Sequence, residues 1–218
     1  TFFVSGIRAE RHPGVVREIL SRGHALGNHS YRHDPLLMLR STGRLREEIA
    51  LAQKALAALD VRPLAFRPPV GITNPRLPGV LKELGMYCLT FSCRAWDRGN
   101  RRINGLAAAI LKKVRPGDIV LLHDVTPKGG EGAGQWIAEA DAIVSGLKAG
   151  GYEILSLEEL IGRPVMERLS VHVPRGDGSK PAPSEGSAAG SGRPSMPLPS
   201  VGRLPEDEPQ KKRKEQNV

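Results

Sequence analysis

The chain has 218 residues, of which 39% are apolar, and a formal net charge of +9. This length can hold one domain with its own core, and no apolar run approaches the roughly 18 residues that a membrane span needs. The basic residues are interspersed with acids and aromatic residues make up only 4% of the chain, so we expect no nucleic-acid partner. Two interpretations of the positive charge remain: a basic face that meets a polyanion or an anionic cell surface, and a face that is merely solvated.

The first 166 residues alternate short apolar runs with amphipathic ones, which indicates repeated strand–helix units. The candidate strands are Thr1–Val4, His24–Gly27, Leu64–Arg67, Met86–Phe91, Asp118–Leu122 and Tyr152–Leu155. The candidate helices are Pro13–Ser21, Arg44–Leu59, Arg76–Leu84, Leu106–Val114 and Gln135–Leu147. Strands that alternate with helices predict a parallel sheet in an α/β fold.

From Pro174 onward, Pro, Gly and Ser make up 20 of 45 residues and no Phe, Tyr or Trp occurs. Such a segment buries too little apolar surface to offset its ordering entropy. We therefore predict a folded domain over residues 1–166 and a disordered, basic tail over residues 167–218. The chain opens with Thr1 rather than Met, so we expect it to be part of a longer protein. Its compartment, cytoplasmic or in a bacterial cell envelope, and its oligomeric state stay open.

Two histidines, His29 and His33, follow the second candidate strand in the run His-Ser-Tyr-Arg-His. On a turn of helix this spacing places both imidazoles on one face, close enough to bind one metal ion. Zinc with an open coordination position needs at least one more protein ligand, usually a carboxylate. The alternative is a pair of surface histidines near the start of a helix.

Three further motifs lie at the ends of later candidate strands. Arg67 is followed by Pro-Pro-Val-Gly, a rigid corner that directs the guanidinium toward the strand ends; the alternative is a plain loop with a surface arginine. Trp96 and Asp97 follow the fourth strand. His123 ends the fifth, where the alternative is a satisfied core histidine. Because chemistry in parallel α/β folds gathers at the C-terminal ends of the strands, we expect these residues to lie together.

In this order, the motifs resemble those of the polysaccharide deacetylase family, the NodB-homology domain of family 4 carbohydrate esterases. His29 and His33 match the family's H-S/T-x-x-H metal motif, the run from Arg67 to Gly71 matches R-x-P-x-G, and Leu121-Leu122-His123 matches L-x-H. The opening T-F-F-V-S-G looks like the family's second strand. The resemblance covers about residues 1 to 165 and implies a distorted (β/α)7-type TIM-like barrel, truncated here by about one N-terminal strand.

The resemblance implies metal-dependent hydrolysis of N-acetyl or O-acetyl groups on a polysaccharide or amino sugar. In this family a divalent metal, usually zinc, acts as a Lewis acid on the acetyl carbonyl. His29 and His33 would be two of its three protein ligands. His123 would be the general acid for the departing amine, Asp97 would orient it, and Arg67 would position the general-base aspartate.

Three residues would contact the carbohydrate substrate by the same resemblance. Leu121 would line the pocket for the acetyl methyl, the backbone N–H of Val70 would serve the oxyanion, and Trp96 would contact sugar. Position 70 is Val where many members have Tyr, and Trp96 precedes Asp97 where a common pattern has Trp after it.

The family's first motif, T-F-D-D-G-P, supplies the catalytic base and the third metal ligand, and this chain has no such residues. Asp34, beside His33, precedes Pro35 and is expected to be a turn residue. We therefore expect a hydrolase with weak metal affinity and impaired activity. The alternatives are a catalytically inactive carbohydrate-binding or scaffold module on the same barrel, and a nucleic-acid partner that acts through the tail.

Overall fold

The structure, a computed structural model, describes residues 1–95, 103–125 and 132–169. The chain divides into two units, Thr1–Val173 and Pro174–Val218, and every described residue belongs to the first. Apart from residues 167–169, the predicted tail lies outside the described residues. None of the helices in the described part is long and apolar enough to cross a membrane.

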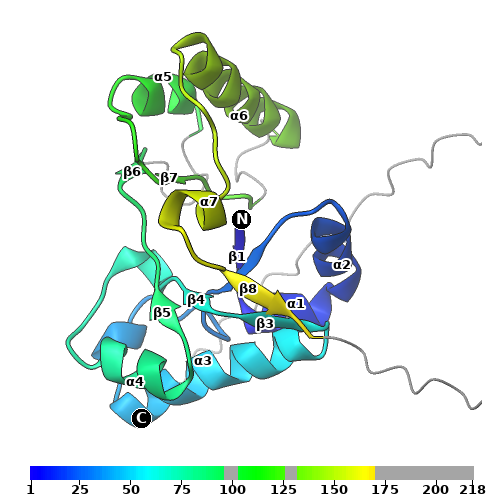
Figure 1. The fold of residues 1–218 in the computed structure, drawn as a ribbon, viewed down its shortest axis with the longest axis vertical. Coiled ribbons are helices and arrows are strands. Elements are labelled where there is room, and N and C mark those ends of the chain that lie inside the picture. The colour runs from blue at the N-terminus through cyan, green and yellow to red at the C-terminus, as the bar shows by residue number, and fades with distance from the viewer. Residues whose placement is uncertain (96–102, 126–131, 170–218) are drawn as a thin grey trace, which may run out of the picture. The chain divides into compact units, whose positions relative to one another are not determined.

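Short strands alternate with helices along the chain (Figure 1). The strands are β1 (Phe2–Val4), β2 (Leu26–Asn28), β3 (Val61–Pro63), β4 (Ala65–Phe66), β5 (Tyr87–Cys88), β6 (Cys93–Arg94), β7 (Val120–Leu121) and β8 (Met166–Arg168). The α-helices are α1 (Gly6–Arg11), α2 (Pro13–Ser21), α3 (Thr42–Ala57), α4 (Leu77–Glu83), α5 (Leu106–Leu111), α6 (Gly132–Ala149) and α7 (Leu157–Ile161). Two 3-10 helices are η1 (Leu37–Leu39) and η2 (Pro69–Gly71).

The main sheet has four parallel strands in the order β1-β2-β4-β5. β6 pairs in parallel with β7 in a second sheet, and β3 pairs antiparallel with β8 in a third. Parallel neighbours joined through helices confirm the predicted α/β fold. In such a sheet the carboxyl ends of neighbouring strands lie at the same edge, which is where loops can bring side chains together.

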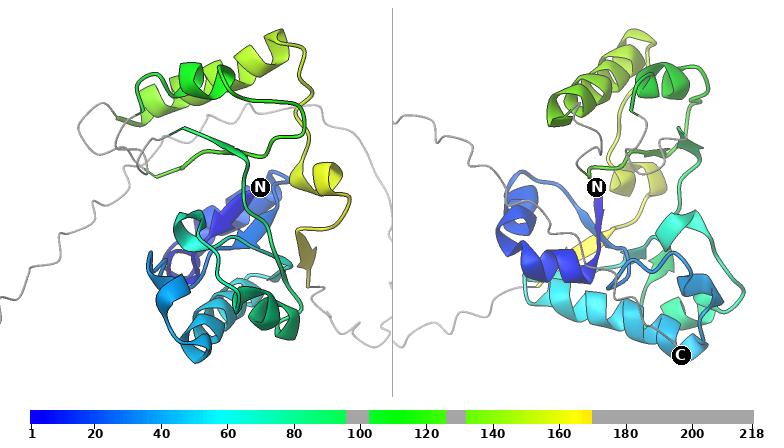
Figure 2. Two further views of the ribbon diagram at one scale, coloured as in Figure 1. Left: turned by 90° about the vertical axis from the view of Figure 1, so that its left-hand side faces the viewer. Right: turned by 180° about the vertical axis from the view of Figure 1, so that it is seen from behind.

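Helix α3 is the clearest amphipathic helix and forms much of the core under the main sheet. The hydroxyl of Ser41 caps it by accepting the Arg44 N–H at 3.2 Å. Its fully buried apolar residues recur every three or four positions: Leu45, Ile49, Ala52 and Leu56. Helix α1 lies alongside it (Figures 1 and 2), and Gly6 permits this approach because a Cβ there would lie 2.9 Å from the Cα of Ala52.

A separate apolar core lies in the second half of the domain. Helices α5 and α6 are side by side in every view (Figures 1 and 2) and pack with β6 and β7. The buried members of this core are Cys93, Ala95, Leu106, Ala107, Ile110, Ile143 and Leu147. The second cysteine, Cys88, is exposed, and both thiols are free.

The predicted strand at Tyr152–Leu155 is wrong, since these residues are outside every strand of the structure. The Tyr152 ring packs on the α5–α6 core and its hydroxyl donates to the Val114 carbonyl at 3.1 Å. Directly afterwards, Ser156 and Glu159 form a capping box that starts α7. Apolar periodicity also missed the short strands β3, β6 and β8.

Candidate active site

Three of the predicted site residues stand at the carboxyl ends of strands. His29 directly follows β2, and its N–H donates to the Val4 carbonyl at 3.1 Å. Arg67 directly follows β4, and its N–H donates to the Asn28 carbonyl at 2.9 Å. His123 comes two residues after the end of β7. His29 and Arg67 therefore lie at the carboxyl edge of the main sheet, as expected, whereas His123 follows a strand of the second sheet.

The two imidazoles of His29 and His33 lie close together, with ring centroids 4.7 Å apart and planes at 69°. The helical turn predicted to align them is wrong. Ser30 and His33 have φ angles of 64° and 58°, in the left-handed region, and a right-handed helix excludes such values. A strained loop, not a helix, therefore pairs the two rings.

A hydrogen bond fixes the tautomer of His29. Its Nδ1 lies 2.7 Å from the carbonyl oxygen of Arg67, and because a carbonyl can only accept, Nδ1 carries the proton. The lone pair of the ring is then on Nε2. Burial, opposed by this hydrogen bond and reinforced by the charges of His33 and Arg67, lowers the pKa of His29 to about 4. His29 is neutral at neutral pH, as a metal ligand must be.

The third imidazole, His123, acts on both members of the pair. Desolvation lowers the pKa of His33, and the charge of His123 lowers it further. The same charge contributes to the lowered pKa of His29. His123 therefore acts electrostatically on the pair, although the described residues form no cluster of three such side chains that could hold one metal ion.

Arg67 is a buried cation, with a relative exposure of 7%. Its Nε donates to the Leu89 carbonyl at 3.1 Å and one terminal nitrogen donates to the Thr90 carbonyl at 2.9 Å. The guanidinium also stacks on the Phe3 ring at 3.8 Å. Burial lowers the pKa of Arg67 to about 10, which still leaves it charged at neutral pH. In the described part of the chain, no carboxylate forms an ion pair with Arg67.

The predicted substrate contacts are described only in part. Val70 lies in η2, is 47% exposed and has a φ of 54°, a strained conformation for a β-branched residue. Leu121 ends β7 and is half-buried. Trp96 and Asp97 lie outside the described residues.

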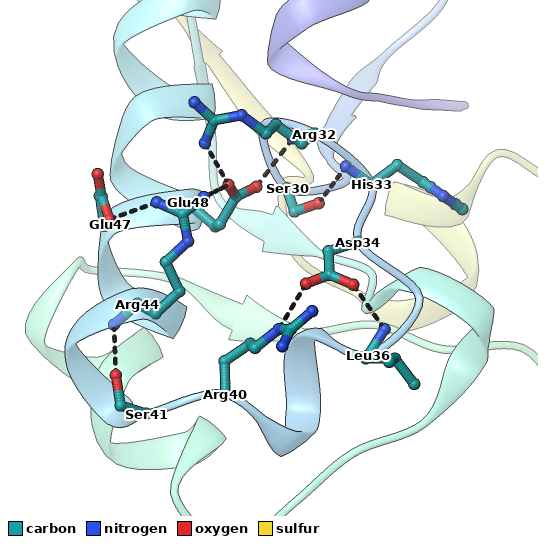
Figure 3. Close-up of polar contacts among 10 residues, drawn as sticks. All are labelled: Ser30, Arg32, His33, Asp34, Leu36, Arg40, Ser41, Arg44, Glu47 and Glu48. Carbon is teal, nitrogen blue, oxygen red and sulfur yellow. Dashed lines mark hydrogen bonds and ion pairs between the residues drawn. The ribbon is translucent and has the colours of Figure 1, made fainter. Parts of the chain in front are cut away.

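The donor set fits a divalent metal in part. His29 and His33 supply two imidazoles with 4.7 Å between ring centroids, but the described residues include no group of three potential ligands. Asp34 does not complete the set. Its Oδ1 accepts the Leu36 N–H at 2.9 Å and its Oδ2 pairs with Arg40 at 2.8 Å (Figure 3), so it acts as the turn residue that was expected.

Two buried polar residues that sequence reasoning missed support the histidine loop. The side chain of Asn28 accepts the Ser30 N–H at 2.9 Å and donates to the Ile49 carbonyl at 3.0 Å. Glu48 of α3 accepts the N–H of Arg32 at 2.8 Å. A signal for Glu48 was present in the sequence: it stands three residues after Leu45, on the apolar face of the helix, where a carboxylate is unexpected.

Comparison with known proteins places this geometry in a family. The polysaccharide deacetylase family model matches residues 1–89. A peptidoglycan-N-acetylglucosamine deacetylase of Bacillus cereus is 33% identical over 164 residues, covering 74% of each chain. A chitooligosaccharide deacetylase of Azorhizobium caulinodans is 32% identical over 168 residues, covering 72% of this chain and 79% of that protein.

A solved structure agrees. The family 4 carbohydrate esterase of Streptomyces lividans in complex with acetate superposes with a TM-score of 0.60 at 26% identity, covering 71% of this chain and 77% of that one. The chain belongs to the polysaccharide deacetylase family, whose members are hydrolases of N-acetyl carbon–nitrogen bonds. Its parallel strands and covering helices match the (β/α)7 barrel of these enzymes, as predicted.

Proposed function

We propose that this protein is a metal-dependent deacetylase that hydrolyses acetyl groups from an N-acetylated glycan or amino sugar. The observation that carries the proposal is the paired histidine rings, 4.7 Å apart, with the Nε2 of His29 held as a lone-pair donor by the Arg67 carbonyl. A surface pair of histidines has no reason to be desolvated, neutral and fixed in one tautomer.

His29 and His33 would hold a divalent metal, for which zinc suits imidazole ligands. When bound, such a metal polarises an acetyl carbonyl and lowers the pKa of a bound water. Because the described residues provide two imidazoles and no third ligand, we expect the affinity of this chain for zinc to be low. Turnover should be low for the same reason.

The remaining residues bind, orient and move protons. His123 would donate a proton to the departing amine, and Asp97 would hold its ring in the productive orientation. Arg67, a buried cation at the same strand ends, favours a carboxylate beside it and would thereby position a general base. The backbone N–H of Val70 would face the oxyanion, and Leu121 would contact the acetyl methyl.

The substrate class follows from the relatives. One acts on peptidoglycan and another on chitooligosaccharides, which share N-acetylglucosamine units. We therefore propose a glycan that contains N-acetylglucosamine, with Trp96 as a contact for a sugar ring.

A second candidate is a carbohydrate-binding or scaffold module that has no catalysis. The observation in its favour is that no third metal ligand accompanies the histidine pair among the described residues. Against it, nothing in sugar binding alone requires a buried Arg67 or a neutral His29.

The two candidates are separated by one pair of measurements. Zinc affinity is measured by competition with a chromogenic chelator, and acetate release is measured on an N-acetylglucosamine oligomer. The variant His29→Ala should lose zinc binding, whereas His12→Ala, at an exposed histidine before α2, should keep it. Equal zinc affinity in all three proteins would rule out the metal site. Binding of the oligomer with no acetate release would favour the scaffold module.

A further inference from the structure

Glu48 is a buried carboxylate directed at the histidine loop (Figure 3). It projects from α3, and its side chain is only 1% exposed. One oxygen accepts the backbone N–H of Arg32 at 2.8 Å. The other accepts Arg32 Nη1 at 2.9 Å and lies 3.0 Å from Arg44 Nη2. The carboxylate is therefore bonded to the peptide unit between His29 and His33, not only to arginine side chains.

The loop needs such an anchor because its backbone is strained. Ser30 and His33 both have positive φ angles, which are unfavourable in a non-glycine residue. Residues persist in this region only when surrounding contacts over-determine them. Two contacts within the loop do so: the Ser30 hydroxyl accepts the His33 N–H at 3.1 Å, and Asn28 accepts the Ser30 N–H.

Glu48 is a side-chain anchor from outside the loop, beside the backbone N–H groups of Gly6 and Ile7, which donate to the Ser30 and Tyr31 carbonyls at 3.0 Å each. A buried carboxylate is costly unless it is fully paired, so an acid at this position contributes little as a core residue. What distinguishes it is the bond to the Arg32 N–H, which fixes the Tyr31–Arg32 peptide, one residue before His33. The neighbouring Glu47 pairs with the same Arg44 but is 53% exposed, and its carboxylate has no bond to the loop.

We propose that Glu48 is a positioning residue for the metal site: through the Arg32 N–H it holds His33 opposite His29. This inference rests on the proposed function, since it takes the two imidazoles as metal ligands. It assigns Glu48 no contact with the metal or the substrate. Its effect reaches the site through the loop backbone.

The test compares Glu48→Gln with Glu47→Gln in the full chain. Glutamine has the shape of glutamate, but its NH2 group replaces one of the two acceptor oxygens and would face either the Arg32 N–H or the guanidinium, which are both donors. We expect Glu48→Gln to weaken zinc binding roughly 10–100-fold, the usual effect of losing a group that orients a ligand. Glu47→Gln should bind zinc within about twofold of the parent, since exposed pairs contribute little.

A second readout needs no metal. Amide hydrogen exchange of Arg32, followed by NMR in the metal-free protein, should be at least about 10-fold faster in Glu48→Gln and unchanged in Glu47→Gln. The variant Arg32→Ala, which keeps the N–H but loses the guanidinium, should retain zinc binding better than Glu48→Gln. If Glu48 served only to pair with the Arg32 guanidinium, the two variants would lose zinc affinity equally. That result would overturn the proposal.

The two hypotheses fail in different ways. If the parent chain binds no zinc, the proposed metal site is wrong, and Glu48 is then judged by Arg32 exchange and by contacts between the His29 and His33 ring protons. If Glu48→Gln does not fold, Glu48→Asp replaces it, because its shorter carboxylate stays charged but withdraws from the loop. Unchanged Arg32 exchange in a folded Glu48 variant overturns the positioning role.

Discussion

The domain has two regions that present their functional residues in different ways. All the buried polar or charged side chains of the described chain lie in residues 1–89, namely Ser5, Asn28, Ser30, Glu48 and Arg67. In residues 93–169, the described core is apolar, apart from the Cys93 thiol. The first region thus holds the histidine pair with hydrogen bonds, whereas the second supplies His123 at the end of a strand held by packing.

This difference shows where the protein buries its polar groups. Burying a polar side chain costs free energy unless every bond is made, so such groups persist where geometry must be fixed. A pair of metal ligands requires fixed geometry, since ring positions must suit one ion. A general acid needs less, because it can adjust when the substrate binds.

The largest expected effect is on kcat, and it distinguishes the role of His123 in the second region from that of the histidine pair in the first. In any preparation that releases acetate, His123→Ala should lower kcat by roughly 10²–10⁴-fold, the usual value of a general acid. Its zinc affinity should equal that of the parent, because His123 is not among the proposed ligands. His29→Ala should instead lose both zinc affinity and acetate release. Loss of zinc binding in His123→Ala would contradict this division of roles.

The next effect probes the buried cation of the first region. Arg67→Lys cannot donate from Nε and a terminal nitrogen at once, nor stack its planar group on Phe3. We expect the free energy of unfolding to fall by about 2–3 kcal/mol, since two charged hydrogen bonds are lost. Arg46→Lys, at an exposed pair with Glu83, should change it by less than about 0.5 kcal/mol. Urea denaturation measures the free energy of unfolding of both variants. Equal losses would mean that the contacts of Arg67 stabilise the fold no more than an exposed ion pair does.

Part of the site could be predicted from the sequence. Periodicity placed His29, Arg67 and His123 correctly at strand ends, because the order of strands and helices alone determines where a parallel sheet collects its loops. The conformation of the histidine loop was not predictable in this way. The Arg32 N–H beside His33 is bonded to Glu48, 16 positions away in the chain, and no local pattern encodes that bond.

The other failures involve contacts between segments that are far apart in the sequence. The pair β3–β8 joins Val61 to Arg168, in two segments of three residues each. The segment Tyr152–Leu155 has strand-like composition, yet its tyrosine is used in side-chain packing rather than in a ladder. Tertiary contacts overrode local propensity at both places.

A smaller effect is expected at the contact between Gly27 of β2 and the Phe3 ring of β1. A Cβ on Gly27 would lie 2.4 Å from the Phe3 ring, the ring on which Arg67 stacks. Gly27→Ala should therefore lower the free energy of unfolding by about 1–3 kcal/mol through overpacking. Gly14→Ala, in helix α2 with nothing within 4 Å of the added carbon, should raise it by about 0.5–1 kcal/mol. Thermal unfolding of both variants decides, and a neutral Gly27→Ala would show that the Phe3 ring moves freely.

The smallest effect concerns Asp34, the carboxylate closest in sequence to the histidine pair. Asp34→Asn keeps an oxygen for the Leu36 N–H but loses the ion pair with Arg40. The hydrogen bond from Arg40 holds the pKa of Asp34 below its ordinary value of 3.8. A carboxylate with a lowered pKa stabilises the fold above its unfolded pKa and loses that contribution as the pH falls through its folded pKa. The variant should therefore be slightly less stable than the parent at pH 7 and equal to it once the pH is well below 3.8.

Zinc affinity turns the same variant into a test of the metal site. A turn residue bonded to Leu36 and Arg40 has no oxygen left for a metal, so Asp34→Asn should bind zinc as the parent does. A clear loss of zinc affinity would mean that Asp34 leaves its turn to become the third ligand. In that event the first region would complete its own site, and the low affinity expected from two imidazoles would no longer apply.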